Sequence, residues 1–322
     1  MTQPVLDIQQ LHLSFPGFNG DVHALNNVSL QINRGEIVGL VGESGSGKSV
    51  TAMLIMRLLP TGSYCVHRGH ISLLGEDALN AREKQLRQWR GARVAMIFQE
   101  PMTALNPTRR IGLQMMDVIR HHQPISRREA RAKAIALLEE MQIPDAVEVM
   151  SRYPFELSGG MRQRVMIALA FSCEPQLIIA DEPTTALDIS VQAQILNLLV
   201  TLQENRELTY VLISHNVSVI RHMSDRVAVM YLGQIVELGD VQQVLTAPAH
   251  PYTRLLLDSL PAIDKPLEEE WALRKTDLPG NRTLPQGCFF RERCPLATHG
   301  CEVRQSLTIR EDGREIRCWR AL

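Results

Sequence analysis

The sequence predicts an α/β protein with a parallel core sheet, an antiparallel β subdomain, a helical subdomain and a small cysteine-containing C-terminal extension. Short continuous apolar runs of strand length alternate with amphipathic helical segments, which is typical of a parallel sheet covered by helices. Prolines and charges become more frequent after about residue 250. This shift predicts a boundary between a large domain, residues 1–250, and an extension, residues 251–322.

Bulk composition excludes several classes of protein. The 322 residues are 45% hydrophobic and 21% charged, as in ordinary globular proteins, and the net charge is −1. Nucleic-acid binders usually carry a strong basic excess, so we expect no nucleic-acid partner. No run reaches the ~18 apolar residues that cross a bilayer. The N-terminus does not resemble a secretion signal, so we expect a cytosolic protein.

The first elements are predicted to be strands. Residues 5–8 and 28–32 alternate apolar with polar side chains, as half-buried strands do. Residues 37–41 are continuously apolar, which fits a strand buried on both faces. A glycine-rich turn follows, and then a helix over residues 48–59.

The two periodicities then alternate along the chain. Helices are predicted over residues 128–143, 159–172 and 191–204, buried strands over 94–98, 177–180 and 210–214, and a hairpin from 227–231 and 235–238 around Gly233. The helical subdomain is predicted to span about residues 100–175.

A phosphate-binding loop is predicted between the strand at 37–41 and the helix that follows it. The run Gly42-Glu43-Ser44-Gly45-Ser46-Gly47-Lys48-Ser49 matches G-x-x-x-x-G-K-[ST] and is called the P-loop below. Its glycines let several N–H groups point at phosphate oxygens, and the helix adds its positive end. Lys48 is expected to lie between the β- and γ-phosphates, and the Ser49 hydroxyl to bind Mg2+.

Polar side chains follow three other buried strands. Asp181 and Glu182 end the strand at 177–180, where Asp181 is expected to hold Mg2+ and Glu182 to act as general base on water. His215 follows the strand at 210–214 and is expected to donate a hydrogen bond to a γ-phosphate. Gln99 follows the strand at 94–98, where an amide oxygen can bind Mg2+.

A second anion-binding helix start is predicted at Ser158, Gly159 and Gly160, which precede the helix at 159–172. One chain cannot easily bring two such helix starts onto one nucleotide. Two subunits placed head to tail can, each closing the other's site. Asp188 is expected to cross the same subunit interface.

Taken in order, these segments resemble an ABC ATPase over about residues 5–245, which implies ATP hydrolysis coupled to transport. The resemblance includes Ala186-Leu187-Asp188, and it differs mildly at Asn216, where relatives often carry Asp. It also places Phe15 where an aromatic side chain stacks on adenine. The implied ATP contacts are Phe15, Gly42, Glu43, Ser44, Gly45, Ser46, Gly47, Lys48, Ser49, Val50 and Gln99, with Mg2+ held by Ser49, Gln99 and Asp181 and catalysis by Glu182, His215 and Lys48.

Residues 42–49, 98–107, 250–256 and 287–295 narrow the resemblance to the dipeptide/oligopeptide/nickel importer branch. It implies a peripheral subunit on the cytosolic face of a bacterial inner membrane. The implied partners are two permease subunits, usually a paralogous ATPase, and an extracytoplasmic solute-binding protein. Residues 100–123 would couple the ATPase to the permeases.

Four cysteines crowd the last 35 residues: Cys288, Cys294, Cys301 and Cys318. Zinc sites usually pair cysteines two to four residues apart, so the spacing fits zinc poorly. Four thiolates suffice for a [4Fe–4S] cluster, to which the resemblance also points. Zinc and metal-free reduced thiols remain alternatives.

Two other functions compete with transport. A non-transport ABC protein would usually carry two cassettes or a long coiled-coil insertion, and this chain has neither. The arginine-rich tail is an alternative nucleic-acid module, against the simpler interpretation as a solvated or permease-facing surface. The solute is expected to be a di- or oligopeptide, with nickel or another small solute as the alternative, and pairing with a second copy or a paralogue stays open.

Overall fold

The computed structural model describes residues 3–100, 104–184, 188–206, 208–259 and 280–321. The chain forms two compact units. The first unit contains residues 1–32, 37–79 and 214–322, and the second contains residues 33–36 and 80–213. Among the described residues no helix has the length and apolar character needed to cross a membrane.

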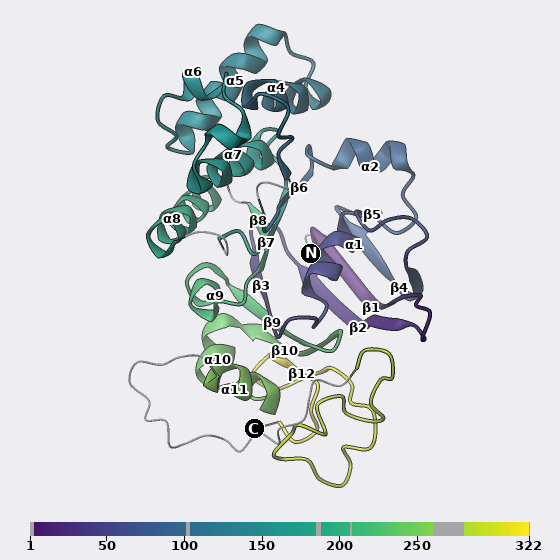
Figure 1. Ribbon diagram of the computed structural model, residues 1–322. Coiled ribbons are helices and arrows are strands. Elements are labelled where there is room, and N and C mark those ends of the chain that lie inside the picture. Colours follow the sequence, from purple (N-terminus) through teal and green to yellow (C-terminus); the bar gives the residue numbers. More distant parts are fainter. Residues whose placement is uncertain (1–2, 101–103, 185–187, 207, 260–279, 322) are drawn as a thin grey trace. The chain divides into compact units, whose positions relative to one another are not determined.

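The first unit begins with an antiparallel sheet of strand order β2-β1-β4-β5 (Figure 1). β1 (Leu6–Phe15) pairs with β2 (Val22–Ile32), and on its other side with β4 (Cys65–Leu73), which pairs with β5 (Glu76–Asp77). The predicted strands at 5–8 and 28–32 are parts of β1 and β2, so the antiparallel subdomain is confirmed. Both strands are longer than predicted because register shifts in β1 break the alternation of apolar and polar residues.

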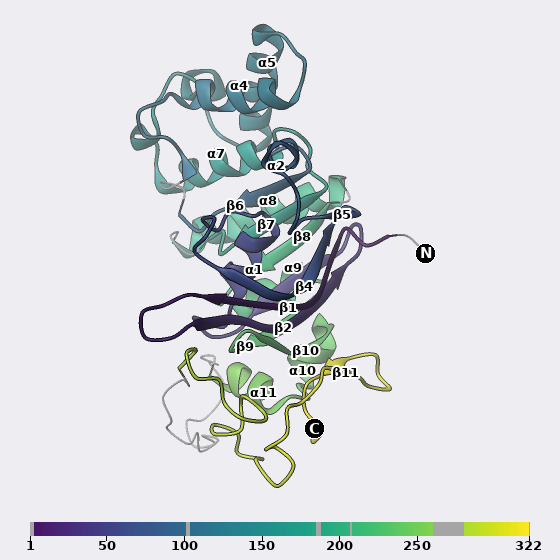
Figure 2. The same cartoon turned by 90° about the vertical axis from the view of Figure 1, so that its right-hand side faces the viewer.

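The same unit contains a second group of strands. β3 (Ile37–Val41) is buried throughout and pairs in parallel with β9 (Arg226–Tyr231), and β9 forms an antiparallel hairpin with β10 (Gln234–Asp240). Strand β3 and the hairpin were predicted. Helix α1 begins at Lys48 as predicted, lies beside β2 (Figure 2), and ends at Ile55, four residues before the predicted end. The other helices of the unit are α9 (Val217–Met223), α10 (Val241–Thr246) and α11 (Pro251–Asp258).

The C-terminal residues belong to this first unit, and most of them are loops (yellow in Figure 1). Two short strands, β11 (Thr308–Ile309) and β12 (Glu315–Ile316), form a hairpin, and β12 adds to the edge of β10. On β10, the fully buried Glu237 carboxylate accepts the N–H groups of Ala249 and His250 at 2.9 Å each. A buried carboxylate therefore satisfies backbone donors where α11 begins.

The described part of the second unit contains three parallel strands. β6 (Val94–Ile97), β7 (Leu177–Asp181) and β8 (Thr209–Ile213) pair in the order β6-β7-β8. These strands were predicted, and their parallel pairing is confirmed. The carboxyl ends of parallel strands meet at one edge of the sheet, which is where α/β proteins place their ligands.

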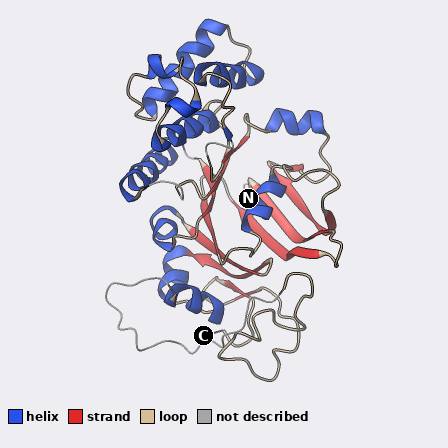
Figure 3. Cartoon of the chain, viewed as in Figure 1, coloured by secondary structure: helices blue, strands red, loops and turns tan. Residues whose placement is uncertain are grey.

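Most helices of the second unit lie beyond one end of its strands, and α8 (Ile189–Arg206) lies alongside them (Figure 1; helices are blue in Figure 3). The other described helices are α2 (Glu83–Trp89), α4 (Ile111–His122), α5 (Arg127–Glu140), α6 (Ala146–Val149), the 3-10 helix η1 (Pro154–Glu156) and α7 (Gly159–Phe171). Helix α5 begins one residue before the prediction because Ser126 and Glu129 form a capping box. Helix α7 contacts α4 and α5 and is buried over most of its length.

Candidate functional site

The P-loop connects β3 to α1 in the first unit. Gly42 has a φ of 149°, and a Cβ there would lie 2.2 Å from the backbone oxygen of Met230. Only glycine fits so close an approach of two backbones. Helix α1 has Gly47 as its N-cap, and no side chain caps it. The positive end of the helix dipole therefore lies at the loop.

Lys48 is buried inside the loop, with 7% of its surface exposed. Its Nζ donates to the backbone oxygens of Gly42 at 2.9 Å and Glu43 at 3.0 Å, and to Ser46 Oγ at 3.3 Å. The loop carbonyls therefore hold the ammonium group in place. Ser49, in the first turn of α1, is exposed.

Gln99, Asp181 and Glu182 are at one edge of the strands in the second unit. Asp181 ends β7 and is buried, with 6% exposure. Glu182 has a φ of 48°, which is uncommon for a residue with a side chain and is a strain often seen at functional sites. Its carboxylate accepts a hydrogen bond from Gln99 Nε2 at 2.8 Å. Two predicted site residues 83 positions apart are thus in direct contact.

Ser158, Gly159 and Gly160 form the start of α7. Ser158 is the N-cap, and its hydroxyl accepts the N–H of Met161 at 3.3 Å. A Cβ on Gly160 would lie 2.8 Å from the side chain of Val191 on α8, so this glycine allows α7 and α8 to approach closely.

Gln163 was not assigned a role from the sequence. It is buried on α7, with 1% exposure, and its Nε2 donates to the backbone oxygen of Pro183 at 2.5 Å. Pro183 directly follows Glu182, so Gln163 connects the helix that starts at Ser158 to the residues beside the proposed base. The sequence gives no signal for this role, because Gln163 is flanked by two arginines and does not interrupt an apolar run.

Asp188 precedes α8 and caps it. Its Oδ1 accepts the Ser190 hydroxyl at 2.7 Å and the N–H of Val191 at 3.0 Å. The bond from Ser190 is the larger cause that lowers the pKa of Asp188, so this exposed carboxylate stays charged at neutral pH. Ala186 and Leu187, which belong to the same predicted segment, lie outside the described residues.

His215 and Phe15 belong to the first unit with the P-loop. His215 is exposed and follows the end of β8 by two residues, and Phe15 is half-buried at the end of β1 opposite Val22. Asn216 caps α9 through a 2.9 Å bond from the N–H of Ser218. Asn and Asp are equivalent at this position of a helix, which explains why the chain can depart from Asp here.

The predicted site residues therefore form two groups. One unit supplies the P-loop, Phe15 and His215, and the other supplies Gln99, Asp181, Glu182, the start of α7 and Asp188. The first group offers N–H donors and a lysine, which suit a polyphosphate. The second offers carboxylates and an amide, which suit Mg2+ and an attacking water.

The four cysteines lie in residues 287–318, which we call the four-cysteine segment. All four are free thiols, with Cys294 and Cys301 buried and Cys288 and Cys318 half-buried. Burial is the main cause that raises the pKa of Cys288, Cys294 and Cys318. Electrostatic repulsion from the nearby Cys301 sulfur raises the pKa of each of them further. Across the described residues, no three His, Cys, Asp or Glu side chains are arranged to hold a metal ion.

Backbone N–H groups point at three of these sulfurs. The N–H two residues further along donates to each of Cys288, Cys294 and Cys318, and lowers its pKa against the effect of burial. Such bonds stabilise thiolates, and in iron–sulfur proteins they tune the cluster. Burial outweighs these bonds, so the net effect raises the pKa of the three thiols and favours their protonated form.

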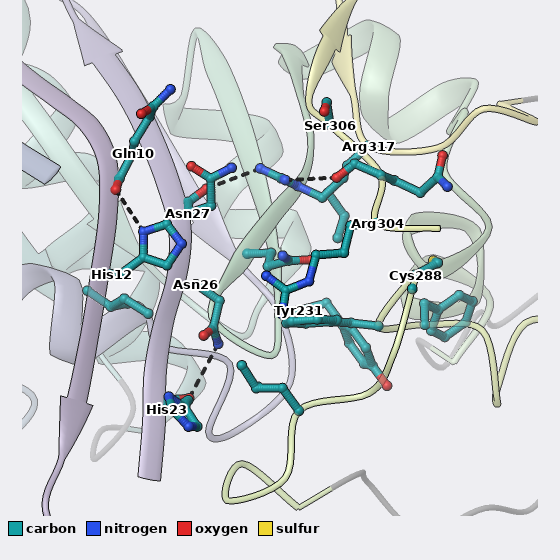
Figure 4. Close-up of a pocket in the computed structure, with 18 of the residues that line it drawn as sticks. Gln10, His12, His23, Asn26, Asn27, Tyr231, Cys288, Arg304, Ser306 and Arg317 are labelled. Atoms are coloured by element: carbon teal, nitrogen blue, oxygen red, sulfur yellow. Dashed lines mark hydrogen bonds between the residues drawn. The ribbon is translucent and has the colours of Figure 1, made fainter. Parts of the chain in front are cut away.

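A pocket of about 490 Å³ lies in the first unit between β1, β2 and the four-cysteine segment (Figure 4). Cys288 reaches its wall from that segment. Arg317 also lines the pocket and is buried, with 4% of its surface exposed. Its guanidinium donates to the backbone oxygens of Asn27, Gln305 and Ile235 at 2.8–3.1 Å. These bonds fasten the end of the segment to β2 and β10.

Comparisons with known proteins agree with this geometry. The model of the ABC transporter family matches residues 25–185, and that of the oligopeptide/dipeptide transporter C-terminal region matches residues 236–301. Probable D,D-dipeptide transport ATP-binding proteins of Escherichia coli strain K12 are similar over the whole chain. DdpD is 72% identical over 99% of this chain and 97% of its own length, and DdpF is 59% identical over 100% of both.

Solved structures are similar as well. The dimeric structure of an ATP-binding cassette in a post-hydrolysis state, bound to ADP and Pi, superposes with a TM-score of 0.66 and 26% identity, covering 73% of this chain and 98% of that chain. The fold and both halves of the site thus define a P-loop ATPase of the ABC class. The chain belongs to the ATP-binding subunits of ABC transporters, in the branch with the oligopeptide/dipeptide transporter C-terminal region, and it hydrolyses ATP in support of transport.

Proposed function

We propose that this chain powers the uptake of di- or oligopeptides. The observation that carries the proposal is its full-length identity of 72% to a protein named for D,D-dipeptide transport, together with the match of its C-terminal region. Nickel and other small solutes are the alternative cargo. The solute is selected outside this subunit, so the ATPase site itself does not discriminate between them.

The assembly we propose has this subunit on the cytosolic face of an inner membrane. Two permease subunits and an extracytoplasmic solute-binding protein complete the importer. Two E. coli proteins named for the same transport process resemble this chain at 72% and 59% identity, which favours a paralogous ATPase partner over a second copy. Residues 100–123 would contact the permeases; of these, residues 101–103 lie outside the described part.

Uptake by the reconstituted complex tests the cargo. Vesicles that contain the permeases, both ATPases, internal ATP and the binding protein should accumulate a labelled dipeptide, and unlabelled D,D- and L,L-dipeptides should compete to different degrees. Uptake of nickel without any uptake of peptide would refute the peptide assignment. The variant Lys48→Ala, which lacks the phosphate-binding ammonium group, is the control for ATP dependence.

The ATPase roles we propose use both groups of site residues. Lys48 and the P-loop N–H groups bind the β- and γ-phosphates, and Phe15 stacks on the adenine. Ser49, Gln99 and Asp181 would hold Mg2+, which when bound neutralises charge on the phosphates. Their oxygen donors fit that hard cation.

Hydrolysis requires a base and charge stabilisation. Glu182 accepts a proton from the attacking water, and His215 and Lys48 stabilise charge that develops on the γ-phosphate. The hydrogen bond from Gln99 supports this assignment, because it fixes the Glu182 carboxylate next to the Mg2+-binding group. The variant Glu182→Gln tests the role of the base, and its expected result closes the Discussion.

We propose further that Ser158, Gly159, Gly160 and Asp188 complete the site of a partner ATPase. The start of α7 is an N-terminus with unpaired donors beyond the one that Ser158 caps, which suits a second phosphate group. Lys48→Ala and Ser158→Arg should each be inactive alone. Mixed in equal amounts, they should recover roughly a quarter of normal turnover if two copies pair head to tail, because half the pairs then hold one intact site.

A control mixture makes this experiment specific. Lys48→Ala mixed with Glu182→Gln should stay inactive, since both changes damage the half of the site that one chain supplies to its own nucleotide. Recovery in the control, or none in the first mixture, would contradict pairing of two copies. The same exchange with one change placed in the paralogue then tests the heterodimer.

The four-cysteine segment is proposed to hold a [4Fe–4S] cluster. Four free thiols that influence one another, three of them accepting backbone N–H bonds, are the chemistry such a cluster uses. When bound, the cluster would supply a structural cross-link between loops. Protein purified without air should be brown and contain four iron and four sulfide per chain; a colourless, iron-free preparation would contradict the cluster, and bound zinc would support the alternative.

A further inference from the structure

Glu43, the second residue of the P-loop, forms an ion pair with Arg293 of the four-cysteine segment. Arg293 Nη1 donates to Glu43 Oε2 and Nη2 to Oε1, both at 2.9 Å. This two-bonded geometry is the strongest and most directional form of a guanidinium–carboxylate pair. The two side chains are 11% and 25% exposed, so the pair is shielded better than a surface salt bridge.

The backbone of Glu43 is held as well. Its N–H donates to the hydroxyl of Tyr252 on α11 at 2.9 Å, and its backbone oxygen accepts the Nζ of Lys48 at 3.0 Å. The amide, the carbonyl and the carboxylate of one loop residue therefore each have a different partner. A shift of Glu43 would disturb the carbonyl that positions Lys48.

Arg293 is itself fixed by aromatic rings. Its guanidinium lies 5.7 Å from the centroid of Tyr231 and 6.0 Å from that of Phe290, within the range of cation–π attraction. Phe290 is buried, with 1% exposure, and packs edge-on against Tyr231 and Tyr252. Arg293 also lies between Cys288 and Cys294 in the chain. Its position thus depends on the order of the four-cysteine segment.

We propose that Arg293 is a positioning residue for the P-loop, through which the four-cysteine segment sets the affinity for ATP. Without Arg293 the Glu43 carboxylate would be an unpaired charge in the loop that binds a polyphosphate anion, and it would compete for Lys48. The proposal rests on the proposed role of the P-loop and holds whether the cysteines bind iron, zinc or nothing.

Binding of a fluorescent ATP analogue to the full chain tests the proposal. Arg293→Met should weaken binding about tenfold, which is modest for the loss of one partner of a shielded pair. Arg293→Lys should recover part of the affinity, because an ammonium keeps the charge and loses the two-bonded geometry. The matched control is Arg291→Met: Arg291 is two residues away, half-exposed and 3.6 Å from Glu302, and its loss should leave affinity unchanged.

A double-mutant cycle with Glu43→Gln separates positioning from general support of the fold. Because Arg293 acts through the Glu43 carboxylate, Arg293→Met should change the dissociation constant less than about twofold when residue 43 is already Gln. An equal loss in both backgrounds, or a lowered melting temperature with normal affinity, would overturn the proposal. Lys48→Ala separates a failure of this proposal from a failure of the proposed phosphate site. Normal binding of the ATP analogue by that variant would refute the phosphate site itself.

A cysteine pair tests the link to the segment. Cys294→Ser should weaken binding of the analogue severalfold in the natural background and cause no further loss when Arg293 is already Met. Cys65→Ser is the control, since Cys65 is an exposed thiol on β4 outside the segment. Unchanged affinity in Cys294→Ser would contradict control of the P-loop by the four-cysteine segment.

Discussion

Protonation of His250 should destabilise the protein as the pH falls below neutrality. The imidazole is buried, with 1% exposure, at the start of α11, where its Nδ1 accepts the N–H of Tyr252 at 3.0 Å. The ring also bonds to the backbone of Arg317. Burial, with a further contribution from the Arg317 charge, lowers the pKa of His250 to about 3. A protonated ring would lose the cap and place a second cation beside Arg317.

The sign and size follow from linkage. In the unfolded chain this residue binds a proton below a pKa of about 6.5, whereas in the folded chain it binds one only below about 3. The contribution of neutral His250 to stability is therefore fully present above pH 6.5 and is lost progressively as the pH falls below that value. At pH 5 the free energy of unfolding should have fallen by about 2 kcal/mol from this residue alone. Burial is complete, so solvent screening does not reduce the figure.

Urea unfolding at pH 7 and pH 5 measures the effect. His250→Asn keeps an N-cap acceptor and removes the titrating group, so the wild type should lose about 2 kcal/mol more than this variant between the two pH values. His299→Asn, at a fully exposed histidine, should behave as the wild type does. Equal losses in the wild type and His250→Asn would refute the reasoning.

Three further substitutions have definite expected results. Gln163→Leu should lower the free energy of unfolding by about 1–3 kcal/mol in urea, because a buried carbonyl loses its donor, and a change below about 0.5 kcal/mol would argue against that bond. Tyr252→Phe should weaken binding of an ATP analogue about fivefold through the freed N–H of Glu43, and unchanged affinity would contradict this. Phe171→Ala should cost about 3–5 kcal/mol, since the ring is fully buried, whereas Phe18→Ala at a fully exposed ring should cost nothing measurable.

Segments whose structure depends on near neighbours were predictable from the sequence. The strand at 37–41 has the predicted bounds because an uninterrupted apolar run admits no other register. The P-loop was equally local, since eight adjacent residues carry the whole signal. Helix α1 ends at Ile55 and not at 59, because the residues that follow turn away, with Arg57 at a φ of 50°. Nothing in the apolar pattern marks that turn.

Contacts between distant parts of the chain were not predictable. Arg293 and Glu43 are 250 positions apart, and neither the P-loop pattern nor the cysteine spacing indicates the other. The start of α11 was missed, although His250-Pro251 combines an N-cap acceptor with a proline at the first helical position. Gln163 lies five residues after Ser158, yet its partner, the backbone oxygen of Pro183, is brought next to it only by the fold of the second unit.

Comparison of ATP binding and ATP turnover in Glu182→Gln tests the central claim most directly. The substitution keeps the size and the hydrogen-bonding capacity of the side chain that contacts Gln99, and removes its ability to accept a proton. Binding should be unchanged while turnover falls by roughly 10²–10⁴, the usual contribution of a general base. Glu204→Gln, on an exposed face of α8, should leave both unchanged. Near-normal turnover in Glu182→Gln would contradict the assignment of Glu182 as the base.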